Sequence, residues 1–184
     1  MRRGGDFQHK GAMRLSGKKV GMLVEEGFED LELWVTVMRL REEGALVPLI
    51  GAAKGKAFTG KNGLHAASTH AFGDLSAREL DALVVPGGWA PDKLRRYREA
   101  VELVKAVHAQ KKIVGLICHA GLVGISAKIV SGRCTGSLGI KDDLENAGGT
   151  FVDEPAFRTG HIVWGRVVDD IPAFCRELVG AIAG

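Results

Sequence analysis

A thiol and an imidazole stand side by side where an apolar run of the chain stops. The run spans Ile113 to Ile117, and Cys118 and His119 follow it directly. Short apolar runs of this kind are typical of a buried strand, and the small and apolar residues after His119 favour a helix. A nucleophile at a strand-to-helix turn stands out at the edge of a sheet, as in the serine elbow of hydrolases. The pattern makes Cys118 a candidate nucleophile.

The turn at Cys118 offers groups that could activate a thiol. A helix start supplies free backbone N–H groups and positive potential, so we expect a thiol of low pKa. The N–H groups of His119 and Gly88 could form an oxyanion hole, because Gly88 has no side chain to obstruct approach. Two alternatives stay open. Free cysteine is among the most buried residue types, and Cys118 could simply end a strand; His119 can serve as a base only if the turn aims its ring back.

Acidic residues crowd the loop after the first expected strand, in the stretch EEGFED at residues 25–30. Four carboxylates would repel a phosphate, and the chain has no glycine-rich phosphate loop, so we expect no anionic cofactor. The sequence gives no sign of any other cofactor, and we expect none. Histidine, cysteine and acid spacings suggest no metal site. Glu29 is ambiguous: it either complements the dipole of the following helix or holds a proton beside a thiolate and hydrogen-bonds the sulfur.

Strands are expected to alternate with helices along the chain. The expected strands are 19–24, 46–50, 82–85, 113–117, 151–152 and 162–164; the expected helices are 30–43, 91–110, 119–130, 140–147 and 171–182, with a hairpin turn at 61–63. This order predicts an α/β fold with a mostly parallel sheet covered on both faces. Ligands of such sheets bind beyond the carboxyl ends of the strands. The loop after Val24, the pair Gly87-Gly88 and Cys118 should therefore meet at one edge.

The bulk composition is that of a globular protein. The 184 residues are 46% hydrophobic and 26% charged, with a net charge of +3 concentrated near the start. We expect an arm over residues 1–17 and a single domain over 18–184. The sequence has no basic face interleaved with aromatic residues, so we expect no dedicated nucleic-acid surface. No apolar run is long enough to cross a membrane. The start lacks the apolar region of a signal peptide, which favours a cytoplasmic location. Cys134 and Cys175 are assigned to packing.

Five stretches carry a family resemblance. They are EEGFEDLEL (25–33), ALVVPGGWAPDKLR (82–95), ICHAGLVGISA (117–127), IKDDLENAGGTFVDEP (140–155) and DDIPAFCREL (169–178). With these in this order, the chain resembles the PfpI family of the ThiJ/PfpI superfamily, which has class I glutamine-amidotransferase-like folds. The resemblance implies a flavodoxin-like three-layer sandwich. It also implies that Cys118 is the nucleophile, His119 its partner, Glu29 the carboxyl that touches the thiol, and Gly88 a backbone donor.

The resemblance further implies a homo-oligomer, a dimer or a hexamer, in which Asp92 of one subunit reaches His119 of another. Two departures from the family pattern concern the site. Ala120 follows Cys-His where the family usually has glycine, and Ser137-Leu138-Gly139 replaces a segment with an aromatic or histidine residue and a proline. The departures leave the expected fold and thiol in place but concern the wall of the pocket and hence the substrate.

The function implied is that of a stress-related cysteine-dependent enzyme. Its substrates would be reactive dicarbonyls, glycated adducts or peptides, attacked at a carbonyl carbon by Cys118. The alternative is a redox-sensing or chaperone-like protein in which Cys118 is oxidised to a sulfinate and Glu29 donates a hydrogen bond to it; a structural thiol in a non-catalytic protein is the third. A glutaminase would need His-x-Glu downstream, but His161 is followed by Ile162-Val163, which excludes that activity.

Overall fold

The computed structural model describes residues 13–184, so most of the expected arm falls outside the described residues. The strands are β1 (Val20–Leu23), β2 (Leu49–Gly51), β3 (Ala57–Thr59), β4 (His65–Ala67), β5 (His70–Ala71), β6 (Ala82–Val85), β7 (Ile113–Ile117), β8 (Gly132–Cys134), β9 (Gly149–Phe151), β10 (Ala156–Thr159) and β11 (Ile162–Gly165). The helices are α1 (Asp30–Glu42), α2 (Ala90–Leu94), α3 (Arg98–Ala109), α4 (Gly121–Ser126), α5 (Lys141–Asn146) and α6 (Ile171–Ala183).

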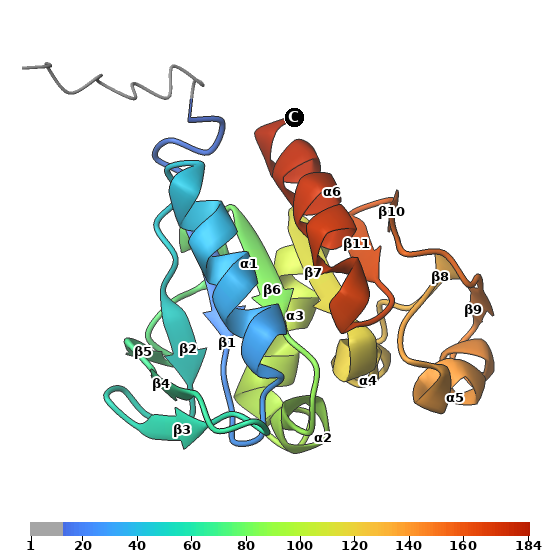
Figure 1. Cartoon of the computed structure of the whole chain (residues 1–184), viewed down its shortest axis with the longest axis horizontal. Helices are drawn as coiled ribbons and strands as arrows, with labels where there is room; N and C mark the ends of the chain where they lie inside the picture. Colours follow the sequence, from blue (N-terminus) through green and yellow to red (C-terminus); the bar gives the residue numbers. More distant parts are fainter. Residues whose placement is uncertain (1–12) are drawn as a thin grey trace, which may run out of the picture.

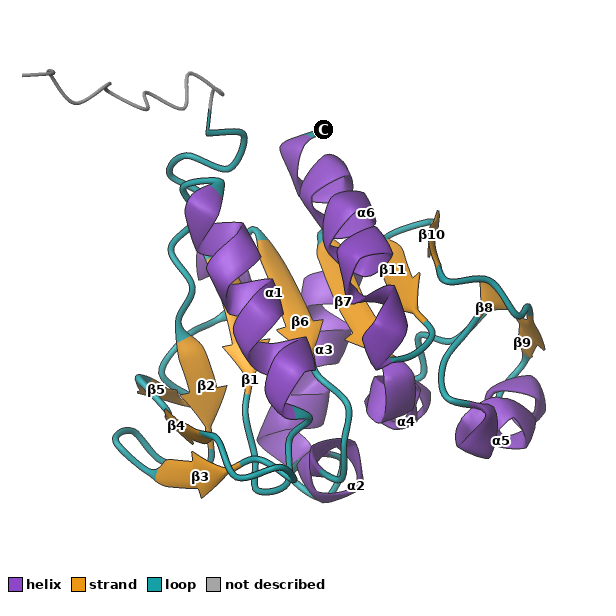
Figure 2. Ribbon diagram, viewed as in Figure 1, coloured by secondary structure: helices purple, strands orange, loops and turns teal. Residues whose placement is uncertain are grey.

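Seven of the described strands form one central sheet in the order β10-β11-β7-β6-β1-β2-β5 (Figure 1). Every neighbouring pair is parallel except β10 and β11. Helices α1 and α6 lie side by side on one face of the sheet, and α3 lies on the other (Figure 2). The expected three-layer α/β sandwich with a mostly parallel sheet is confirmed.

The three central strands of the sheet, β1, β6 and β7, are formed by apolar segments of the sequence. Every residue of β1, β6 and β7 is buried, as expected for strands covered by helices on both faces. Because the three strands are parallel neighbours, their carboxyl ends meet at one edge of the sheet. The loops after β1, β6 and β7 therefore come together there, as the sequence predicted.

One expected strand starts later than predicted. β2 begins at Leu49 rather than at residue 46, and Pro48 stands just before it. Proline has no N–H to give to a ladder, but its carbonyl accepts the N–H of Met22 at 2.9 Å. The short strand β5 pairs with the outer side of β2, so β2 is second from the edge.

The long helix expected over residues 91–110 is two helices, and that prediction is wrong. Tyr97 has an extended backbone with φ −90° and ψ 113°, which separates α2 from α3. Its ring packs against Phe72 with the ring centroids 5.2 Å apart, a contact that helical periodicity cannot reveal. The helix expected over 119–130 is also shorter, because a 3₁₀ turn over Cys118–Ala120 precedes α4.

The packed part of the chain begins before residue 18. Leu15, which the sequence assigned to the arm, is fully buried in the core, and its N–H donates to the carbonyl of Glu43 at 2.8 Å. The N–H of Arg14 donates to the carboxylate of the same Glu43 at 3.1 Å. At least residues 14 and 15 are therefore fixed to the end of α1.

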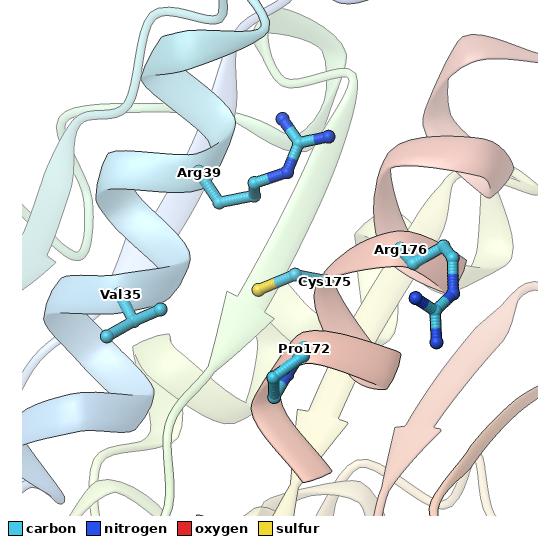
Figure 3. A pocket seen from close by; sticks show the side chains of 5 residues that line it. All are labelled: Val35, Arg39, Pro172, Cys175 and Arg176. Carbon is cyan, nitrogen blue, oxygen red and sulfur yellow. The ribbon is translucent and has the colours of Figure 1, made fainter.

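A hollow of about 350 Å³ lies between α1 and α6 (Figure 3), and Cys118 is not among the residues that line it. Its lining residues are Val35, Arg39, Pro172, Cys175 and Arg176. Cys175 is 4% exposed and Cys134 is fully buried, in keeping with the packing role that the sequence assigned to both. None of the helices that the structure describes combines the length and apolar character needed to cross a membrane.

Candidate active site

Cys118 occupies a sharp elbow between β7 and the 3₁₀ turn that leads into α4. Its φ is 59°, in the left-handed region that residues with a side chain seldom adopt. The residue before it is still extended, and the residues after it are helical. The carbonyl of Cys118 accepts the N–H of Ser137 at 3.1 Å, which holds the elbow against the segment before α5. The side chain is partly buried. The strand-to-helix elbow predicted from the sequence is present.

Two backbone N–H groups, those of His119 and Gly88, form hydrogen bonds to the Cys118 sulfur and act to lower the pKa of the thiol. Gly88 reaches this position through a left-handed backbone with φ 74° and a bridge to Phe28. The neighbouring N–H of Trp89 donates to the carbonyl of Gly27 at 2.8 Å. The loops after β1 and β6 are therefore locked together beside the thiol.

Gly88 has no room for a side chain, so a substitution there tests the contact between the loops after β1 and β6. A Cβ there would lie 2.5 Å from Glu29 N and 2.5 Å from Gly27 O, both backbone atoms. We expect Gly88→Ala to lower the free energy of unfolding by at least about 2 kcal/mol, from backbone strain and overpacking together.

Gly55→Ala is the matched control for Gly88→Ala, because Gly55 has φ 78° and no atom lies within 4 Å of the place that an alanine methyl group would take there. It should show the backbone strain alone, about 1 kcal/mol. Urea unfolding of the two variants measures the difference. Equal losses in both would contradict the tight packing of Gly88 against the loop after β1.

The carboxyl group beside the thiol is that of Glu32, so the expectation that Glu29 touches Cys118 is wrong. Glu29 caps α1: its carboxylate accepts the N–H of Glu32 at 2.8 Å and the side-chain amide of Asn62 at 3.2 Å. Glu32 lies one turn further along the inward side of α1 and is fully buried. One of its oxygens, Oε2, accepts the N–H of Gly87 at 2.6 Å, and the carboxyl interacts with the Cys118 thiol.

Burial governs the protonation of this pair. It raises the pKa of Glu32 from 4.5 to about 7, and the charge of Glu29 adds to the rise. Burial and the adjacent Glu32 charge raise the pKa of Cys118 from 9.0 to about 12, against the N–H groups of His119 and Gly88. Burial therefore acts against the low pKa expected of this thiol, because α4 is a short helix and desolvation opposes the effect of its N-terminus. Near neutral pH the pair carries at most one negative charge.

The imidazole of His119 turns back toward the thiol, with Nδ1 3.3 Å from the Cys118 sulfur. Partial burial lowers the pKa of His119 below 6.5, and the positive charge of Lys61 lowers it further. The ring is therefore neutral at pH 7 and able to accept a proton. The segment Ser137-Leu138-Gly139, which departs from the family pattern, lies beside the imidazole ring of His119. A Cβ on Gly139 would lie 3.5 Å from Nε2 of this ring, but glycine places no side chain there.

Asp92 does not reach His119 within the chain. It lies exposed in the first turn of α2 and forms an ion pair with Arg96 one turn later. The structure thus brings Cys118, His119 and Gly88 together, places Glu29 one turn away, and leaves Asp92 on the surface. Its intersubunit role stays a prediction.

Two residues near the site were missed from the sequence. Glu32 could have been found from spacing, since Glu32, Thr36 and Leu40 repeat every four residues and are all buried on α1. Lys61 had no such signal. It belongs to the turn between β3 and β4, and only the fold brings its charge close to Glu32 and His119.

Comparison with known proteins gives the same assignment along the whole domain. The model of the DJ-1/PfpI family matches residues 18–181. A deglycase of Pyrococcus abyssi is 41% identical over 162 residues, which are 88% of this chain and 97% of the relative. General stress protein 18 of Bacillus subtilis is 38% identical over 164 residues, 88% of this chain and 95% of the relative.

Solved structures agree with the sequence relatives. A two-domain protein of Anabaena variabilis, with DJ-1/ThiJ/PfpI-like and ferritin-like domains, superposes with a TM-score of 0.86 at 32% identity. The match covers 89% of this chain and 47% of that one, so the chain spans about half of the two-domain protein. A cysteine elbow, a buried glutamate beside it and a family match over nearly the whole domain lead to one conclusion: this chain belongs to the DJ-1/PfpI family.

Proposed function

We propose that the protein is a cysteine-dependent enzyme that converts reactive dicarbonyls, or the adducts they form with proteins, through covalent attack by Cys118. The observation that carries the proposal is the grouping around one sulfur of a buried carboxyl, a neutral imidazole and two backbone N–H groups. Such a grouping can hold a thiolate, move a proton and stabilise a developing oxyanion, which are the needs of carbonyl chemistry. The name of the Pyrococcus abyssi relative as a deglycase supports the same class of reaction.

The thiol proton can be accommodated within the site. Transfer of this proton from Cys118 to the adjacent Glu32 carboxylate gives the reactive state, in which the single negative charge of the pair lies on the sulfur. The thiolate adds to the aldehyde carbon of methylglyoxal, and the carbonyl oxygen takes up a proton to give a hemithioacetal. His119, neutral at pH 7, removes the proton from that carbon and the adjacent ketone becomes an enediol; return of a proton to the second carbon gives a thioester. Water then releases lactate and restores the thiol.

Turnover of methylglyoxal tests the proposal. We expect lactate to appear in step with loss of methylglyoxal, with one water consumed for each molecule converted. The same preparation is incubated with a methylglyoxal-modified peptide, whose repair would extend the activity to adducts. Absence of turnover with both substrates, in protein whose Cys118 is shown by mass spectrometry to be reduced, would contradict an enzyme of this class.

A redox-sensing role is the second candidate, and one observation favours it. Near neutral pH the Glu32 carboxyl is partly protonated beside the sulfur, so it could donate a hydrogen bond to a sulfinate formed at Cys118. Mild peroxide treatment followed by mass spectrometry separates the candidates. Selective, stoichiometric sulfinate at Cys118 together with no dicarbonyl turnover would favour the sensor.

We further propose that the site is completed across a subunit interface by Asp92. Three observations support this: Asp92 is exposed, the neighbouring Trp89 is 65% exposed, and Gly139, which has no side chain, lies next to the Nε2 end of His119. Large exposed aromatic residues are enriched at interfaces. A partner carboxylate at Nε2 would fix the tautomer of His119 and stabilise its protonated form.

Subunit mixing tests the shared site. Cys118→Ser and Asp92→Asn chains should each be inactive or nearly so, and exchange of subunits between them should restore part of the wild-type turnover, because each supplies what the other lacks. Exchange is followed with a mass-tagged chain. Confirmed exchange with no recovery would leave Asp92 as an acid that complements the N-terminus of α2.

A further inference from the structure

The turn between β3 and β4 is fastened to the start of α1, although neither strand belongs to the central sheet. The buried carboxylate of Asp30 accepts the N–H of Asn62 at 2.8 Å and that of Leu64 at 2.7 Å. The Asn62 side chain donates to Glu29 at 3.2 Å. Asp30 is only 2% exposed, so these hydrogen bonds hold the turn in a fixed position.

This fastening brings Lys61 next to the active site. The N–H of Lys61 donates to the carbonyl of Phe28 at 2.9 Å, and Phe28 is bridged to Gly88, whose own N–H reaches the Cys118 sulfur. Two residues thus separate the backbone of Lys61 from the nucleophile. The ammonium group is close enough for its charge to lower the pKa values of both Glu32 and His119.

Within residues 13–184, no ion pair neutralises the charge of Lys61. Every salt bridge of this part of the chain involves other cations, and the Lys61 side chain is exposed. Two acids at this edge of the sheet are engaged elsewhere, since Glu29 caps α1 and Glu32 lies beside the thiol. Without Lys61, these two carboxyl groups would repel an anionic substrate. Lys61 therefore offers a positive charge at the mouth of an otherwise acidic site.

We propose that Lys61 binds a carboxylate on the substrate and makes the site select dicarbonyls that carry one a few bonds beyond the reacting carbonyls. The inference rests on the proposed function, in that the carbonyl carbon must react at Cys118. A lysine suits this task because its flexible stem carries a compact charge that can follow carboxylates at slightly different distances. Substrates of this class are acyclic 2-oxoaldehydes with a terminal carboxylate.

Two five-carbon substrates isolate the contribution of the charge. In 4,5-dioxopentanoate the chain beyond the oxoaldehyde ends in a carboxylate, whereas in 2-oxopentanal it ends in a methyl group. The products, 2-hydroxyglutarate and 2-hydroxypentanoate, are measured separately. Both substrates react at the same thiol, so the ratio of their kcat/KM values divides out any effect of a substitution on the reactivity of Cys118.

We expect the wild type to favour 4,5-dioxopentanoate by about 10-fold at low ionic strength, as one partly solvated ion pair would give, and the preference to shrink as salt is added. Lys61→Gln should remove most of this preference, and Lys61→Glu should reverse it. Lys54→Gln is the matched control, because it removes the same charge from an exposed lysine that precedes the same hairpin, and its ratio should equal that of the wild type.

The possible outcomes distinguish failure of the role of Lys61 from failure of the proposed enzymatic function. Turnover of both substrates with the same ratio in the wild type and in Lys61→Gln overturns the role of Lys61 and leaves the enzyme intact. An equal fall of the ratio in Lys54→Gln also overturns it, because the effect would then be that of net charge. Failure to convert methylglyoxal and both five-carbon substrates overturns the proposed function and this inference with it.

Discussion

Cys118→Ser should lower kcat/KM for methylglyoxal by three orders of magnitude or more, on the order of the loss seen when a covalent nucleophile is removed. A serine hydroxyl ionises far less readily than a thiol, and neither His119 at 3.3 Å nor the backbone donors can supply that difference. The substitution is nearly isosteric, and the left-handed backbone at this position stays as strained as before. Lactate production in the two proteins is the measurement.

The control for this substitution is Cys175→Ala, which removes a thiol that lies between α1 and α6 and 3.7 Å from the hydroxyl of Thr36. It should keep turnover within about twofold of the wild type, at a modest cost in stability. Equal melting temperatures for wild type and Cys118→Ser would show that the loss of activity is chemical. Retention of turnover by Cys118→Ser would exclude covalent catalysis at this residue.

Glu32→Gln should make Cys118 more acidic. In the wild type, burial and the Glu32 charge raise the pKa of the thiol to about 12, and the glutamine removes the charge while it can still accept the N–H of Gly87. We expect the midpoint of iodoacetamide labelling against pH to fall by at least about one unit, since one of the two main causes is gone and desolvation remains. Mass spectrometry measures the label on Cys118 separately from that on the other cysteines.

The same substitution should change how stability depends on pH. The folded protein holds the Glu32 proton up to about pH 7, whereas the unfolded chain releases it near 4.5. Between these values the folded state binds more protons than the unfolded state, so Glu32 makes the free energy of unfolding fall as pH rises. The fall amounts to at most about 3 kcal/mol for this one group. Glu32→Gln cannot ionise and should lose this slope in urea unfolding at pH 4.5 and 7.5.

Glu29→Gln distinguishes Glu32 from its neighbour on α1. Glu29 caps the helix, so its substitution should affect stability through the cap while the labelling midpoint of Cys118 moves much less than in Glu32→Gln. Glu32→Leu removes both the charge and the proton. It should acidify the thiol but lose turnover, if the carboxyl must hold the proton in the reactive state. Equal midpoints in the wild type and Glu32→Gln would remove Glu32 from the protonation of the site.

The centre of the fold could be predicted because its signals are local. The apolar runs of β1, β6 and β7 are buried on both faces, so they are continuous, and helices with apolar stripes follow two of them. The outer strands were harder. β8 and β10 are short and partly exposed, so their own composition gives little signal, and β8 pairs with β9 only after the intervening helix α5. The break at Tyr97 likewise depends on a distant partner, Phe72.

The site shows where sequence reasoning stops. The elbow at Cys118 was predictable because a strand must end before a helix begins, and that turn leaves the side chain exposed to the loops around it. The resemblance assigned the contact with the thiol to Glu29, whereas the acid of α1 that reaches across depends on where Gly87 lies, which local sequence does not show. The rise that burial causes in the pKa of Cys118 could not be foreseen, because local sequence describes a helix terminus but not the desolvation of a side chain.

The left-handed backbone of Cys118 has an evolutionary consequence. At φ 59° a side chain adds about 1–3 kcal/mol of backbone strain that glycine would not have. The nucleophile therefore occupies a strained position of the domain. A lineage that no longer needs the thiol would gain stability by substituting glycine here, and nothing would hold the cysteine in place. Persistence of cysteine at this position among descendants of this chain would therefore record continued selection on its chemistry, whereas glycine would mark the copies that have abandoned it.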